Sequence, residues 1–65
     1  MSEDREIWKS AQEMIDRYGQ DALSQINTRI AELEGLGETE ALSVWKRIRG
    51  ATETLLQGRS PGSRH

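Results

Sequence analysis

Apolar side chains recur along this chain at spacings of three and four, and glycines divide them into three blocks. Such spacing places side chains on one face of an amphipathic helix. The blocks end at Gly19, Gly35 and Gly58. They comprise Ile7, Trp8, Ala11, Met14, Ile15 and Tyr18, then Ala22, Leu23, Ile26, Ile30 and Leu33, and then Ala41, Val44, Trp45, Ile48, Ala51, Leu55 and Leu56. The pattern predicts an all-α fold.

We expect a small three-helix domain over residues 1–58, with helices at about 3–18, 22–34 and 40–57. Gly19 fits the left-handed position that ends a helix, and Asp21 fits the N-cap of the next one. The first two helices should be neighbours because so short a segment connects them. A two-helix hairpin, in which helices 1 and 2 run nearly continuously through Gly19, is the alternative.

The second connection holds two glycines around a single leucine. We expect Gly35 to end the second helix in the left-handed conformation, with Leu36 folding back onto that helix. Gly37 or Thr39 would then cap the third helix. Gly50 falls on the side of the third helix opposite its apolar face, where we expect it to face solvent.

The chain has 65 residues, which limits it to one domain with a modest core. It has no cysteine and a single histidine, so we expect neither disulfides nor a structural metal ion to stabilise it. No apolar run approaches the roughly 20 residues that a membrane span needs. The acidic N-terminus lacks the apolar segment of a signal peptide, and we therefore expect a cytoplasmic protein.

Charge is distributed unevenly along the chain. Residues 1–40 carry four basic and ten acidic side chains, a net charge of −6, whereas residues 41–65 carry five basic and one acidic, a net charge of +4. One interpretation is that two acidic helices pack beside a basic one. The other is that the basic C-terminal third faces nucleic acid or an acidic partner. Residues 59–65 form a basic segment rich in glycine, serine and proline, which we expect to be disordered.

The sequence contains no motif for catalysis, for a cofactor or for a metal. His65 is the last residue of the expected disordered tail, where it is poorly placed as a base. The carboxylates fall mainly on predicted polar faces. Gly35 and Gly37, which flank a single leucine, do not match the motif of a phosphate-binding loop. We therefore expect neither an enzyme nor a small-molecule ligand.

Nucleic-acid binding is the runner-up function. The second and third predicted helices meet at a short glycine turn, and the third carries Lys46, Arg47 and Arg49. Recognition helices, however, usually approach bases with their N-terminal residues, and here that end carries Glu38 and Glu40. An accessory protein that uses the basic C-terminal third thus remains the alternative to a protein-binding module.

Trp8, Trp45 and Ile48 are the expected core anchors, because each lies on an apolar face. Either tryptophan could instead lie at a subunit interface. Leu42 lies on a charged flank of the third helix, where it could be an exposed leucine or the centre of a docking patch. That candidate patch consists of Leu42, Lys46, Arg49, Glu53 and Leu56. We expect it to bind a protein partner, or a second copy in a homodimer.

Residues 7–56 also carry a combination of motifs seen together elsewhere. Trp8, Ala11, Met14, Ile15 and Arg17 lead into Tyr18-Gly19-x-Asp21-Ala22, and Arg29, Leu33, Trp45, Arg47, Ile48, Ala51 and Leu55 follow. This combination resembles a group of short, uncharacterised bacterial helical proteins in which a second tryptophan leads the last helix. The resemblance implies a small bacterial helical protein and brings no established activity.

Overall fold

Helical conformation accounts for nearly all of residues 2–58, the part of the chain that the computed structural model describes. The elements are α1 (Ser2–Tyr18), the short 3-10 helix η1 (Gly19–Asp21), α2 (Ala22–Leu36) and α3 (Thr39–Leu56). The all-α fold class is confirmed, and the predicted helix ends differ from the observed ones by at most two residues. The predicted disordered tail, residues 59–65, lies outside the described residues.

The joint between α1 and α2 combines features of both predicted architectures. Helical conformation continues from Ser2 to Leu36 with only η1 in between, so this part of the chain is a kinked helix, as in the alternative hairpin. Gly19 has a φ of +60°, the left-handed conformation expected of it, and this changes the direction of the chain. Asp21 occupies the N-cap position of α2 as predicted, but its side chain makes no cap hydrogen bond.

The predicted end of α2 at Gly35 is wrong. The helix continues through Leu36, and Gly37 takes the left-handed conformation, with a φ of +73°. The amide of Gly37 donates to the carbonyl of Glu34 at 3.2 Å, and that of Glu38 donates to the carbonyl of Leu33 at 3.1 Å. These two bonds form a Schellman ending two residues later than expected. Glu38, rather than Gly37 or Thr39, is the N-cap of α3.

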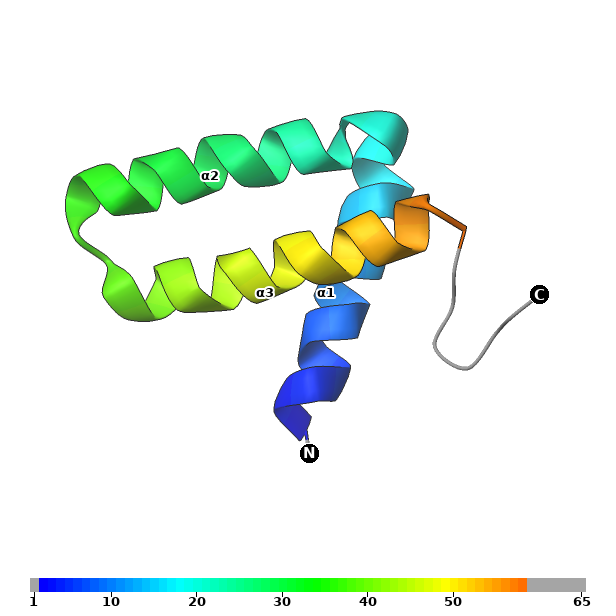
Figure 1. The fold of residues 1–65 in the computed structure, drawn as a ribbon, viewed down its shortest axis with the longest axis horizontal. Helices are drawn as coiled ribbons and strands as arrows, with labels where there is room; N and C mark the ends of the chain where they lie inside the picture. The colour runs from blue at the N-terminus through cyan, green and yellow to red at the C-terminus, as the bar shows by residue number, and fades with distance from the viewer. Residues whose placement is uncertain (1, 59–65) are drawn as a thin grey trace.

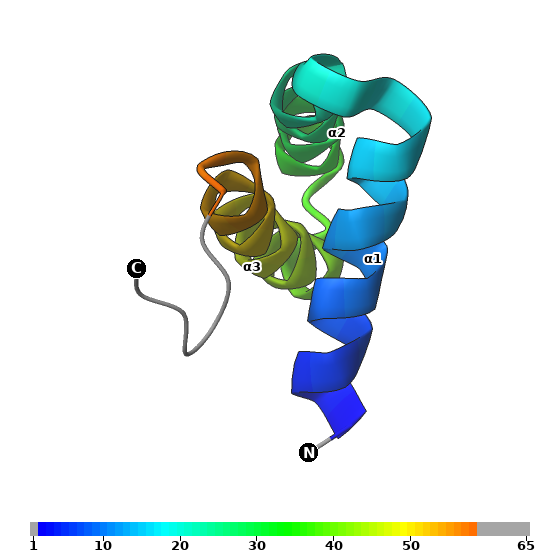
Figure 2. The ribbon, with the colours of Figure 1, turned by 90° about the vertical axis from the view of Figure 1, so that its right-hand side faces the viewer.

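Helices α2 and α3 form an antiparallel pair, which α1 crosses. Helices α2 and α3 run side by side in opposite directions, and α1 crosses behind α3 at a steep angle (Figure 1). Figure 2 shows α1 along one side of the pair. Helix α1 packs mainly on α3 and barely touches α2 beyond their joint. The N-terminal half of α3 and the C-terminal half of α2 therefore extend beyond α1 (Figure 1).

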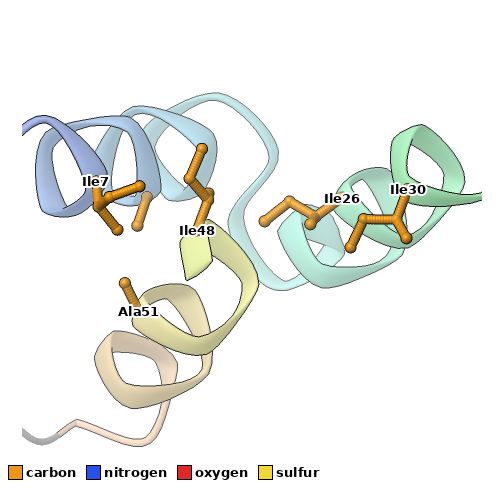
Figure 3. Packing of buried hydrophobic residues seen from close by; sticks show 6 residues of the cluster. Ile7, Ile26, Ile30, Ile48 and Ala51 are labelled. Carbon is orange, nitrogen blue, oxygen red and sulfur yellow. The ribbon is translucent and has the colours of Figure 1, made fainter. Parts of the chain in front are cut away.

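The core lies where the three α-helices meet. Its buried side chains come from all three and are small or β-branched: Ile7, Ala11, Ile26, Ile30, Ile48 and Ala51. In Figure 3, Ile48 of α3 lies between Ile7 of α1 and Ile26 of α2. Thr52 is also fully buried, and its hydroxyl donates to the carbonyl of Ile48 at 2.8 Å, so the hydroxyl is not left without a partner.

Several apolar side chains lie nearer the surface than their pattern predicted. Tyr18 and Val44 are each 38% exposed although their spacing places them on apolar faces. Leu36 is 73% exposed, so it does not fold back onto α2. Gly50 faces open space, as predicted. Among the described residues, no helix is long and apolar enough to span a bilayer.

Candidate interaction grooves

The crossing of α1 over α3 leaves a groove on each side. The first, here called the Trp45 groove, has a volume of about 260 Å³ and is lined by Ser10, Glu13, Met14, Arg17, Trp45 and Ile48. The second, the Trp8 groove, has a volume of about 290 Å³ and is lined by Asp4, Ile7, Trp8, Arg47, Gly50, Ala51 and Thr54. At about 100° per residue, the two sets fall on opposite flanks of both helices.

Each groove has a tryptophan in its wall. Trp8 and Trp45 are both half-buried and pack against the core cluster. Ile48 is buried, as expected of a core anchor. A half-buried indole keeps one part of its apolar surface in the core and leaves another part open to a ligand. The crossing thus presents both tryptophans of the chain in concave surroundings.

Small residues open both grooves. Gly50 is exposed and has no atom within 4 Å of the position that a Cβ would take, which leaves the Trp8 groove open on the α3 side. Ser10 has the corresponding place on α1 in the Trp45 groove. Larger side chains at either position would occupy the groove next to a tryptophan.

Charged residues surround the apolar floors. Glu13 and Arg17 line the Trp45 groove, and together with Asp16 they also line a shallow hollow on the adjoining surface of α1. Asp4 and Arg47 line the Trp8 groove. An apolar centre within a charged rim is the usual arrangement of a protein-binding surface.

The candidate patch predicted on α3 is partly used by the fold. Leu42 is half-buried and packs against the core, so it is not the exposed leucine of a charged flank. Arg49 donates from Nη1 to Oδ1 of Asn27 on α2 at 3.2 Å. Leu56 is half-buried, whereas Lys46 and Glu53 are exposed. The candidate patch therefore borders α2 instead of forming one open surface.

Charged side chains make contacts both within α2 and between α2 and α3. The ion pair that the structure shows most plainly lies within α2, where Arg29 Nη1 is 3.3 Å from Glu32 Oε1 and both side chains are more than half exposed. Such exposed pairs contribute at most about 1 kcal/mol. Of the basic residues of α3, Arg49 bonds to an amide rather than to a carboxylate.

No group of three or more His, Cys, Asp or Glu side chains gathers as a metal site would require within the described residues. His65 lies outside them. The grooves themselves were not predicted, because a helical pattern does not say where one helix crosses another. No family model, no curated protein and no solved structure matches this chain, so its resemblance to a bacterial group stays a prediction.

Proposed function

We propose that this protein is a small helical interaction module that binds a protein partner, or a second copy of itself, through the two grooves beside the α1–α3 crossing. The observation that carries the proposal is that Trp8 and Trp45 each lie half-buried in a different groove. Tryptophan is among the residues that contribute most to binding at protein interfaces.

The size of the grooves favours a protein ligand. Pockets for drug-sized molecules have volumes of about 300–1,000 Å³ and enclose most of the ligand. The Trp45 groove and the Trp8 groove, at about 260 and 290 Å³, are both smaller than that range. Each has room for one or two side chains of a partner, with the charged rim in contact with the partner's backbone or polar groups.

Nucleic-acid binding through the basic C-terminal third has weaker support. Arg49 is bonded to Asn27, and Arg47 lines the Trp8 groove on a different flank of α3 from Lys46. The three basic residues of α3 therefore do not form one stripe that follows a phosphate backbone. Retention of nucleic acid that weakens steeply with salt would favour this alternative.

Two substitutions fill the grooves without disturbing the core. Gly50→Gln fills the Trp8 groove and Ser10→Gln fills the Trp45 groove, and glutamine is a better helix former than either glycine or serine. Gly35→Gln and Ser43→Gln make the same changes at exposed helical positions that line neither groove. All four variants should keep the helical circular dichroism of the parent.

The test is affinity capture from a native extract with the parent and the four variants, combined with sedimentation of each purified protein. We expect a captured protein, or self-association, to be lost in at least one groove variant and kept in both controls. Retention of the same proteins by the parent and both groove variants would contradict the proposal, as would an absence of both capture and self-association.

A further inference from the structure

We propose that the Trp45 groove is the surface on which two copies of this chain pair about a two-fold axis. This inference depends on the proposed interaction function and names the partner for one of its two grooves. The Trp8 groove stays open in such a pair, because it lies on the opposite flank of both α1 and α3.

Apolar side chains of both helices are accessible at this groove. Met14 and Trp45, which line it from α1 and α3, are half-buried, so part of each apolar side chain is open to a partner. Their exposure follows from the fold, because α1 crosses α3 steeply and covers only part of it (Figure 1). A small domain that has neither a disulfide nor a metal gains stability when a second copy buries such a surface.

The rim of the groove is charged in a self-complementary way. Glu13 and Arg17 are exposed, line the same groove and stand one turn apart, about 6 Å along α1. Within the described residues, neither side chain has an ion-pair partner. When two copies of α1 lie antiparallel about an axis at the level of Ile15, Glu13 of each copy faces Arg17 of the other. The rims of the two copies thus form two interchain ion pairs.

This charge pattern points to a second copy rather than to an unrelated helix. A two-fold interface uses the same surface on both molecules, so each charge must meet its opposite when the surface is rotated onto itself. Opposite charges at i and i+4 meet this condition in an antiparallel pair. The second copy's α1 then lies along the groove, with Met14 of one copy toward Trp45 of the other, a sulfur–aromatic contact that proteins favour.

Charge reversal tests this pairing without touching the core. Glu13→Arg leaves two positive charges on the rim, and Arg17→Glu leaves two negative ones. Each single variant should dimerise at least about tenfold more weakly than the parent, because two-fold symmetry repeats each like-charge contact. The double variant Glu13→Arg/Arg17→Glu should dimerise like the parent. An equimolar mixture of the two single variants should form heterodimers.

Sedimentation equilibrium from micromolar to millimolar protein measures these masses against the 7.4 kDa of one chain. Arg29→Glu and Glu32→Arg are the controls, because they reverse an exposed charge pair on α2 away from the groove, and they should leave dimerisation unchanged. A parent that stays monomeric overturns the inference. So does a dimer that the single variants do not weaken, that the double variant does not restore, or that the controls weaken equally. Capture of a different protein that Gly50→Gln abolishes would then still support the interaction function.

Discussion

Ile48 is the side chain on which the core depends most. It lies between α1 and α2 and is buried, whereas Leu36 at the end of α2 is 73% exposed (Figure 3). We expect Ile48→Ala to lower the free energy of unfolding by about 2–5 kcal/mol, the range for emptying a buried aliphatic site. Leu36→Ala should change it by less than about 0.5 kcal/mol. Urea titrations of both variants provide the measurement, and equal losses would contradict a core centred on Ile48.

The two tryptophans differ from Ile48 in what their removal should do. Emptying a fully buried aromatic site costs about 3–5 kcal/mol. Trp45 is half-buried, so part of its surface contributes nothing to the core, and its truncation should cost less than that range. The rest of the indole is available for binding.

The turn between α2 and α3 depends on which of two glycines is left-handed. Gly37 has a φ of +73°, whereas Gly35 is an ordinary helical residue with open space around it. Gly37→Ala should destabilise the fold by about 1–2 kcal/mol, the cost of the left-handed conformation for a residue with a Cβ. Gly35→Ala should instead stabilise it by up to about 1 kcal/mol. Thermal or urea unfolding gives the sign, and reversed signs would place the end of α2 at Gly35.

The same contrast tests the joint between α1 and α2. Gly19 is left-handed, and Gly50 lies within α3 with nothing near the site of a Cβ. We expect Gly19→Ala to destabilise the protein and Gly50→Ala to stabilise it, each by about 1 kcal/mol. If Gly19→Ala raised the unfolding midpoint instead, α1 and α2 would form a straighter continuous helix than the one described.

The sequence predicted the elements better than their ends and their neighbours. Periodic apolar spacing located every α-helix to within two residues, because such spacing has a direct geometric cause. It could not tell Gly35 from Gly37, since both are compatible with a left-handed helix end and only the packing of the two helices decides. It also missed Thr52, whose polar side chain is buried because its hydroxyl bonds to the carbonyl one turn back.

At the scale of the whole molecule, the candidate site depends on a crossing that no local pattern encodes. The grooves exist because α1 lies across part of α3, and Trp8 and Trp45 lie half-buried in their walls. A sequence shows which residues share a helix face, but the angle between two helices follows from how side chains of both interlock. For this reason the residue types of the site could be anticipated and its shape could not.

Because α1 packs mainly on α3 and little on α2, we expect it to open without separating α2 from α3. Such a local opening exchanges amide hydrogens at a lower free energy than global unfolding. We expect the amides of α1 to exchange faster than those at Ile26, Ile30 and Ala51, as measured by native-state hydrogen exchange. Uniform protection along the chain would show instead that the three helices open as one unit.

Both grooves have one wall made by α1, so both vanish when it detaches. Any molecule bound in either groove must therefore slow hydrogen exchange throughout α1, including residues that it does not touch, since it binds only the closed state. Since the closed position of α1 forms both grooves, a ligand bound in one groove also stabilises the other. The two surfaces are therefore coupled through the position of a single helix.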